Sequence, residues 1–299
     1  MRHLSIRRVL LAILALVIAG GLYATGVLQI RTEELRTTSD GVELSGLLAT
    51  PRFGSPPFPT VVVVHGSGPA ASTTSRALRG FVAKLVPEGF AVLIHDKRGS
   101  GSSGGSLPNT GLAGTEAELR ILAADVEAWV ALLKRHKAID AERIGLLGGS
   151  QAGWVMPLVA ARDPELVFVV AISGPTVTLG EEDDFSKLTG DDPGRFAPGQ
   201  LTEAEISSRL EAYSGPAWYD PAPSLQAMRQ PSLWLFGGLD RSVPTELCRK
   251  RIASLPADVA ERMDVRWYPQ GDHSLRLPDG SRIDYWSDLT GWMLERVKP

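Results

Sequence analysis

Short apolar runs alternate with segments of helical spacing along most of the chain, and this alternation limits the fold more than any other feature of the sequence. The runs are Thr60–Val64, Ala91–Ile94, Arg143–Leu147, Leu166–Ile172, Ser232–Phe236 and Val265–Tyr268. Nearly unbroken Val, Ile and Leu are typical of strands that are covered on both faces of a parallel sheet. Between the runs, apolar residues recur at helical intervals, as at Leu119, Leu122, Val126 and Trp129. The pattern predicts a mostly parallel, doubly wound α/β sheet with right-handed crossovers.

Two segments depart from this alternation. Arg31–Thr38 and Val42–Thr50 flank a Ser-Asp-Gly turn and predict a β-hairpin. Pro175–Arg229 holds an acidic stretch and a helical pattern at Glu203–Tyr213. We expect this segment to be a small cap inserted after a strand, because long insertions in compact domains often serve function. A surface excursion is the alternative.

Residues 1–30 have the pattern of a targeting segment. The 20 residues Val9–Leu28 carry no charge and follow three arginines, and a helix of that length would span the hydrocarbon core of a membrane. An uncleaved membrane anchor and a cleaved signal peptide, with small residues near Ala24 for cleavage, both fit this pattern, and a buried core helix is the third alternative. Either of the first two places residues 31–299, which we expect to form one domain, outside the cytoplasm.

The charge and cysteine content exclude several classes of protein. The formal net charge is −3, and residues 31–299 hold 28 basic and 34 acidic residues, so no basic face for nucleic acid is expected. Cys248 is the only cysteine, which excludes an internal disulfide and a multi-cysteine zinc site. It lies in a helical pattern, where we expect it to be packed. The sequence shows no cluster with the spacing of metal ligands, and no cofactor is expected.

A candidate nucleophile follows the Arg143–Leu147 run. The sequence there is Gly148-Gly149-Ser150-Gln151-Ala152-Gly153, followed by helix-forming residues. A sharp strand–turn–helix needs small neighbours, because the two backbones approach closely, and it exposes the hydroxyl of its serine. The N-terminus of the following helix directs amide N–H groups towards this site, which makes the Gln151 N–H a candidate donor to an oxyanion. Ser150 is therefore the predicted nucleophile, with an ordinary strand-to-helix turn as the alternative.

This segment resembles the nucleophile turn of the α/β-hydrolase superfamily, in particular its dienelactone-hydrolase-like and prolyl-oligopeptidase-like serine hydrolases. The family motif is G-x-S-x-G, and this chain departs from it at Ala152. The resemblance implies an α/β-hydrolase fold. It also implies a second oxyanion donor, the Ser67 amide, in the loop His65–Pro69 that follows the first apolar run. We expect the ring of His65 to brace that loop.

The acid and the base of a catalytic triad are expected later in the chain, in the order Ser, acid, His. Asp240 lies in a Gly-rich turn after the Ser232–Phe236 run, at the place that the resemblance assigns to the acid. His273 follows the last predicted strand, at the place of the family's base. Asp272 is a second candidate for the acid. Neighbouring side chains in an extended loop point in different directions, however, which favours Asp240.

These residues predict a serine hydrolase in which Ser150 attacks a carbonyl carbon, His273 takes the proton and Asp240 orients the imidazole. Our first expectation is a carboxylic ester hydrolase with a small-molecule substrate. A peptidase or thioesterase with the same triad is one alternative, and a catalytically silent binding protein on this fold is another. Trp218 and Tyr219 of the expected cap either wall an acyl pocket or pack the cap onto the sheet.

Overall fold

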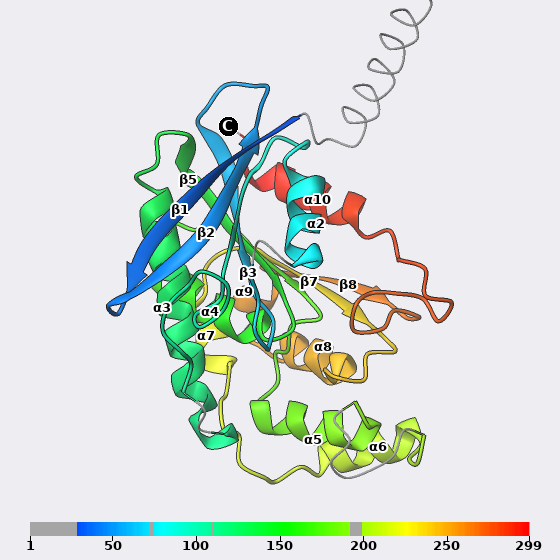
Figure 1. Cartoon of the computed structure of the whole chain (residues 1–299). Coiled ribbons are helices and arrows are strands. Elements are labelled where there is room, and N and C mark those ends of the chain that lie inside the picture. The colour runs from blue at the N-terminus through cyan, green and yellow to red at the C-terminus, as the bar shows by residue number, and fades with distance from the viewer. Residues whose placement is uncertain (1–28, 72–74, 109–110, 192–198, 299) are drawn as a thin grey trace, which may run out of the picture.

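One eight-stranded sheet forms the centre of the protein (Figure 1). The computed structural model describes residues 29–71, 75–108, 111–191 and 199–298. The strands lie in the order β1-β2-β4-β3-β5-β6-β7-β8. Their bounds are β1 (Ile30–Ser39), β2 (Val42–Pro51), β3 (Phe58–Val64), β4 (Ala91–His95), β5 (Ile139–Gly149), β6 (Val169–Ile172), β7 (Ser232–Gly237) and β8 (Met263–Tyr268). The β1–β2 hairpin and the β2–β4 pair are antiparallel, and every pair from β4 to β8 is parallel, which confirms the predicted sheet.

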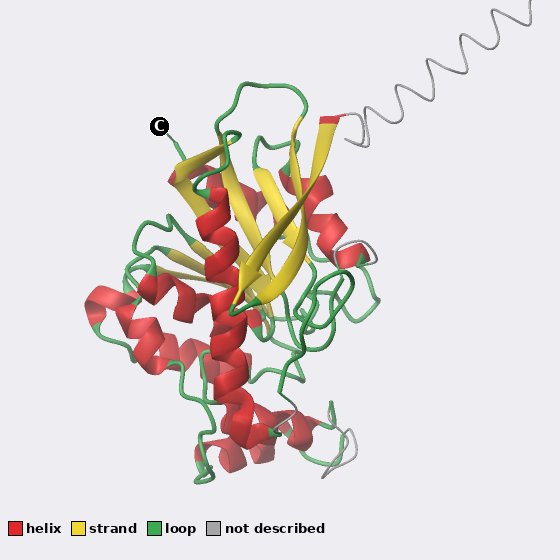
Figure 2. Ribbon diagram, turned by 60° about the vertical axis from the view of Figure 1, so that its left-hand side comes forward, coloured by secondary structure: helices red, strands yellow, loops and turns green. Residues whose placement is uncertain are grey.

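Helices cover both faces of this sheet. One face carries α2 (Arg76–Leu85) and α10 (Trp286–Arg296), and the other carries α3 (Thr115–Leu133), α4 (Ala152–Arg162) and α8 (Thr245–Ala253). The turn of view in Figure 2 brings the 19-residue α3 to the front of the sheet. Val61 and Val63 of β3 are buried with apolar residues of α2 and α10, whereas Val62 and Val64 are buried with those of α3 and α4. This division follows from the two-residue period of a strand.

The C-terminal helix begins later than the sequence predicts. The apolar pattern predicts a helix over Ile283–Val297, but α10 starts at Trp286. The Ile283 N–H donates a hydrogen bond to the carbonyl oxygen of Leu275 at 3.1 Å, and Arg276 and Arg282 form an isolated β-bridge. These contacts hold Ile283 in the loop that carries His273 and keep it out of the helix.

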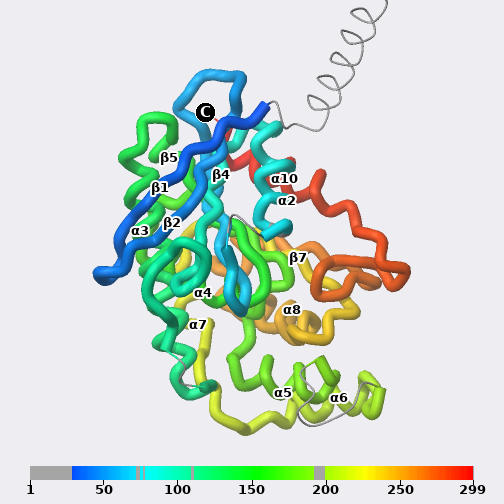
Figure 3. The backbone as a smooth tube through the Cα atoms, in the orientation of Figure 1, coloured from blue at the N-terminus to red at the C-terminus, as the bar shows by residue number. Residues whose placement is uncertain are grey.

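The described parts of the segment 175–229, which are 175–191 and 199–229, contain three helices: α5 (Leu179–Thr189), α6 (Glu203–Glu211) and α7 (Ala222–Ala227). We call α5 and α6 the cap helices. They lie side by side at the bottom of Figures 1 and 3. The sequence pattern predicts α6 but misses α5. Both helices begin with a capping box, Thr178 with Glu181 and Thr202 with Glu205, and this T-x-x-E pattern is the signal that locates α5.

The predicted hydrophobic helix, Val9–Leu28, lies outside the residues that the structure describes. Within the described ranges, no helix is both long and apolar enough to cross a membrane. The first described strand, β1, begins two residues after this segment, at Ile30.

Candidate active site

Ser150 occupies the turn between β5 and α4. Its φ is +54°, in the left-handed region that non-glycine residues rarely adopt. Its N–H donates a hydrogen bond to the carbonyl oxygen of Ile172 at 3.0 Å, which ties the turn to the end of the neighbouring strand β6. The hydroxyl of Ser150 makes no hydrogen bond within the described part of the chain. Strained backbone of this kind is concentrated at functional sites, where it aims a side chain outwards.

The small residues around Ser150 explain why Ala152 is accepted in place of the family's glycine. A Cβ on Gly148 would lie 2.5 Å from the Cβ of Ala152 and 2.6 Å from the carbonyl oxygen of Val64. Gly148 therefore leaves the space that the Ala152 methyl fills. The close approach to the next loop falls one residue later, where a Cβ on Gly153 would lie 2.6 Å from the Cα of Gly174. In this chain the close backbone contact requires a glycine at position 153 and not at position 152.

The loop after β3 lies against the serine turn, because β3 and β5 are neighbouring parallel strands. A Cβ on Gly66 would lie 3.3 Å from the Gly149 carbonyl oxygen and 3.4 Å from the Cβ of Ser150. Ser67 follows Gly66 in this loop. Among the residues described, the amide N–H groups of Ser67 and Gln151 donate no hydrogen bond to another protein group.

His65 braces this loop, as predicted from the sequence. Its ring is buried, and its Nε2 donates a hydrogen bond to the carbonyl oxygen of His95 at 2.6 Å. The two imidazole rings also pack edge-on, with centroids 4.2 Å apart. Burial lowers the pKa of His65 to about 4, so this ring is neutral at physiological pH.

The structure brings the predicted base and acid together. The Nδ1 of His273 donates to the Oδ2 of Asp240 at 2.8 Å. The side chain of Asp240 has no exposed surface, and its Oδ1 accepts the N–H groups of Ser242 and Val243, each at 2.9 Å. Burial lowers the pKa of His273, but the hydrogen bond and the negative charge of Asp240 outweigh it and raise the pKa above its ordinary value.

Two glycines let the loops of acid and base meet. A Cβ on Gly237 would lie 2.3 Å from the carbonyl oxygen of Gly271, and one on Gly238 would lie 2.5 Å from that of Pro269. Any larger residue at the end of β7 would push the loop after β8 away. The backbones therefore pack directly against each other, and His273 comes within reach of Asp240.

Asp272, the second candidate for the acid, forms hydrogen bonds within its own turn and not with His273. Its Oδ1 accepts the N–H groups of Ser274 and Arg276, both at 2.8 Å. These bonds stabilise the loop that presents His273. The hydrogen-bonding partner of the imidazole is Asp240 alone among the carboxylates of the described residues.

The cap helix α5 reaches the loop of the acid. The Thr189 hydroxyl donates to the carbonyl oxygen of Arg241, and the Arg241 guanidinium donates back to the Thr189 carbonyl oxygen. Glu182, three residues before Phe185 in α5, carries a half-buried carboxyl group to which no sequence motif points. Burial, followed by the charge of Asp183, raises the pKa of Glu182 to about 8.

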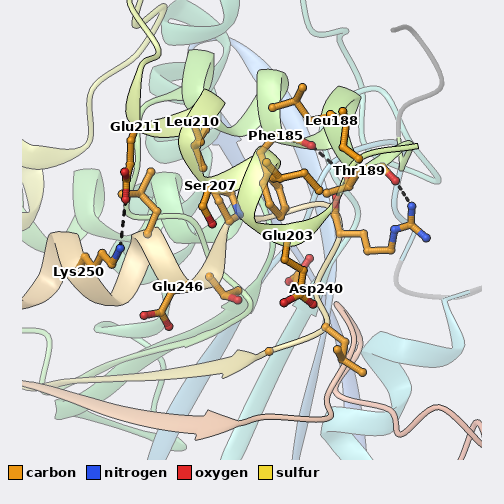
Figure 4. A pocket seen from close by; sticks show the side chains of 18 of the residues that line it. Phe185, Leu188, Thr189, Glu203, Ser207, Leu210, Glu211, Asp240, Glu246 and Lys250 are labelled. Atoms are coloured by element: carbon orange, nitrogen blue, oxygen red, sulfur yellow. Dashed lines mark hydrogen bonds and ion pairs between the residues drawn. The ribbon is translucent and has the colours of Figure 1, made fainter. Parts of the chain in front are cut away.

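A cavity of about 520 Å³ separates the cap helices from the β7–α8 loop and α8 (Figure 4). Asp240 lies in its wall, and the apolar part of its lining includes Phe185, Leu188, Ile206, Leu210, Leu239 and Trp267. Trp218 and Tyr219 do not line this cavity, which favours the second of the two alternatives, that they pack the cap onto the rest of the protein. Tyr219 is buried and packs edge-on against Trp154, with ring centroids 6.3 Å apart, because its segment folds back against α4.

Two further sequence predictions concern groups away from the serine turn. Cys248 is fully buried in α8, where its sulfur accepts the Thr176 N–H at 3.4 Å. Burial raises the pKa of this thiol to about 12, so it stays protonated and unreactive. Among the described residues, no three His, Cys, Asp or Glu side chains gather in a way that could hold a metal ion.

Residues 78–299 match the prolyl oligopeptidase family. The chain belongs to this family. It is 28% identical over 253 residues to human dipeptidyl peptidase 8, an alignment that covers 81% of this chain and 26% of that protein. It is 30% identical over 230 residues to esterase EstD of Thermotoga maritima, covering 71% of this chain and 53% of EstD. The chain thus spans about a quarter of the length of dipeptidyl peptidase 8 and about half of the length of EstD.

A solved structure with the same fold is the esterase Pf2001 of Pyrococcus furiosus. Its TM-score is 0.64 at 20% sequence identity, and the alignment covers 90% of this chain and 91% of that one. At this identity the similarity shows the fold alone. Together with the family match, it confirms the predicted resemblance to α/β-hydrolase serine hydrolases.

Proposed function

We propose that this protein hydrolyses carboxylic esters through a triad of Ser150, His273 and Asp240 and a covalent acyl-enzyme. The observation that carries the proposal is the 2.8 Å hydrogen bond between His273 Nδ1 and Asp240 Oδ2, with the carboxylate fully buried. It leaves Nε2 as the nitrogen that can accept a proton. The three residues follow β5, β7 and β8, whose carboxyl ends meet at one edge of the parallel sheet.

In the acylation half-reaction, the Ser150 Oγ attacks the ester carbonyl carbon while His273 Nε2 takes the hydroxyl proton. A C–O bond forms, and the carbonyl π electrons move onto the oxygen to give an oxyanion. The Ser67 and Gln151 amides donate to that oxyanion. Collapse of the intermediate breaks the bond to the alcohol, which leaves with the proton held by His273.

In the deacylation half-reaction, a water molecule replaces the alcohol. His273 takes one of its protons as the oxygen attacks the acyl carbon, and a second oxyanion forms at the same two amides. The Ser150–acyl bond then breaks, and the proton returns from His273 to the Ser150 oxygen. Asp240 remains ionised throughout, holding the tautomer of the imidazole and stabilising its charged form. No step needs a metal or an organic cofactor.

Esters are favoured over peptides by the similarity to EstD, an esterase that is 30% identical to this chain over 230 residues. The peptidase relatives are much longer, since the chain covers only 26% of dipeptidyl peptidase 8. A peptidase or thioesterase using the same triad is the second candidate. We assign the apolar part of the substrate to the 520 Å³ cavity beside Asp240, because its lining is rich in apolar side chains.

The test is covalent labelling with a fluorophosphonate, followed by turnover of matched p-nitrophenyl ester, thioester and aminoacyl-anilide substrates. We expect the purified protein to be labelled at Ser150 and to cleave the ester fastest. Ser150→Ala should abolish labelling, and His273→Ala should reduce turnover about as much, because a hydroxyl without its base is a poor nucleophile. The double variant should be hardly worse than either single variant. Undiminished turnover by folded Ser150→Ala would refute the mechanism, and faster anilide cleavage would favour the peptidase.

We also propose an extracytoplasmic location, with Val9–Leu28 as a membrane anchor or a cleaved signal peptide. The support is the uncharged 20-residue run and the arginines before it. Full-length protein should fractionate with membranes if the segment is retained, and should carry a new N-terminus near residue 27 if it is cleaved. Full-length protein that stays in the cytosol with an intact N-terminus would contradict both.

A further inference from the structure

A buried lysine joins the two segments that carry the proposed oxyanion donors. Lys97 follows β4 and is 3% exposed. Its Nζ donates one hydrogen bond to the carbonyl oxygen of Gly66, at 2.9 Å, and another to the side-chain Oε1 of Gln151, at 2.8 Å. Gly66 precedes Ser67, and Gln151 follows Ser150. A single ammonium group therefore contacts both halves of the proposed oxyanion hole.

The hydrogen bond from Lys97 to the Gly66 carbonyl also fixes the orientation of the Ser67 N–H. The Gly66 C=O and the Ser67 N–H belong to one planar peptide unit and point in opposite directions. Holding the carbonyl oxygen on Lys97 therefore sets the direction in which the Ser67 N–H points. An ammonium on the carbonyl also polarises that peptide and makes its N–H a stronger donor.

The bond to Gln151 acts on the other donor. Gln151 stands at the start of α4, and its side chain makes no capping bond to the helix. The hydrogen bond from Lys97 fixes the orientation of the Gln151 side chain, and through it restrains the Gln151 backbone. The segment carrying the Gln151 N–H is thus tied through Nζ to the loop that carries the Ser67 N–H.

Lys97 is itself firmly placed. Its backbone N–H donates to the carbonyl oxygen of Ala70 at 2.8 Å, so its main chain and its side chain both bind the loop after β3. The next residue, Arg98, is buried and pairs with Asp125 of α3. These bonds fix the Lys97 segment between β4 and α3, which gives it the rigidity that a positioning group needs.

The ammonium is held without a carboxylate partner in the described part of the chain. Burial lowers the pKa of Lys97 to about 8, and the charge of Glu118 only partly opposes this. His65, His95 and Asp96 are the other titratable groups around it. A buried charge without an ion-pair partner costs folding free energy. Packing alone would be served better by an apolar side chain.

We propose that Lys97 is a positioning residue for catalysis, which holds the Ser67 and Gln151 amides in the geometry that stabilises the oxyanion. The inference rests on the proposed function, since it assigns a role within that mechanism. Lys97 touches neither the substrate nor the reacting atoms. Its effect is exerted through two amides, and it should therefore act on the transition state rather than on the bound ester.

The test compares Lys97→Met with wild type in kcat, KM and affinity for an alkyl boronic acid, which forms a tetrahedral adduct on the serine. We expect kcat to fall about 100-fold, as for loss of one oxyanion donor, with KM changed less than about threefold. Boronic acid affinity should fall in parallel with kcat. Lys134→Met is the matched control, because it removes a lysine that is bound to Asp163 and Glu165 at the C-terminal end of α3, and its kinetics should match wild type.

Gln151→Ala removes one of the two acceptors of the Lys97 ammonium and keeps the Gln151 backbone N–H. It should therefore lower kcat and boronic acid affinity, but by less than Lys97→Met does. The Lys97→Met/Gln151→Ala double variant should be no slower than Lys97→Met alone. A folded Lys97→Met enzyme with kcat and boronic acid affinity within about threefold of wild type would overturn the inference. If Lys97→Met does not fold, Lys97→Gln and Gln151→Ala decide by the same criteria. Activity that survives in Ser150→Ala would overturn the proposed function instead.

Discussion

Gly153 and Gly174 are in backbone-to-backbone contact, so close that a Cβ on Gly153 would lie 2.6 Å from the Cα of Gly174. The contact joins the first turn of α4 to the loop after β6. It sets how deeply the helix behind Ser150 sits against the sheet. The position that tolerates no side chain is thus Gly153. The family motif G-x-S-x-G has its last glycine one residue earlier, at position 152.

Gly153→Ala is expected to lower the free energy of unfolding by about 1–3 kcal/mol, because the new methyl group meets main-chain atoms that cannot yield cheaply. The matched control is Ala152→Gly, which restores the G-x-S-x-G pattern. It should cost about 1–2 kcal/mol, through lower helix propensity and the loss of one buried methyl group, and keep ester turnover. Urea unfolding of both variants measures the difference. Equal stability of Gly153→Ala and wild type would show that the contact is not tight.

Asp240→Asn should reduce kcat by about 10⁴-fold, because the imidazole loses the anion that holds its tautomer. Asp272→Asn should cost less than about tenfold, since Asp272 accepts bonds from its own turn and not from the imidazole. Steady-state turnover of one p-nitrophenyl ester by both variants tests this. A larger loss in Asp272→Asn would mean that the acid is assigned wrongly.

The pH dependence of turnover should report His273, because only a neutral imidazole accepts the serine proton. Asp240 outweighs the effect of burial and raises the pKa of His273 above 6.5. We therefore expect kcat/KM to rise with pH through a midpoint above 6.5, as the imidazole loses its proton. In Asp240→Asn the anion is gone while burial remains, so the midpoint for residual activity should move to lower pH. A midpoint that stays in place in this variant would contradict the assignment of Asp240.

Phe185→Ala should enlarge the cavity beside Asp240 and shift preference towards longer acyl or alkyl chains by about tenfold in relative kcat/KM. Trp218→Ala is the comparison, because Trp218 packs against the core and lies outside that cavity. In a folded Trp218→Ala variant the chain-length preference should equal that of wild type. The measurement is kcat/KM over a series of p-nitrophenyl esters. A shift in Trp218→Ala without one in Phe185→Ala would place the substrate elsewhere.

The order of the elements and the position of the serine turn could be predicted from local patterns. Apolar runs of strand length, helical spacing between them, and glycines around Ser150 are properties of neighbouring residues. Burial on both faces of a sheet imposes such patterns directly, so they can be seen without the fold. Among the described helices, the sequence pattern missed α5 and the two short helices α7 and α9 (Ala257–Ala260). Acidic residues interrupt the apolar pattern of α5, although its capping box marks its start.

Contacts between distant loops were decided by the tertiary structure alone. Asp240 and Asp272 both lie near the place expected for the acid of the triad. Only Asp240 bonds to His273, because the loops after β7 and β8 pack against each other at Gly237 and Gly238. The link from Lys97 to Gly66 and Gln151, and the choice of Phe185 rather than Trp218 as a cavity wall, depend in the same way on segments far apart in the chain. Such contacts have no period along the sequence, because they arise only when separate strands end at one edge of a sheet.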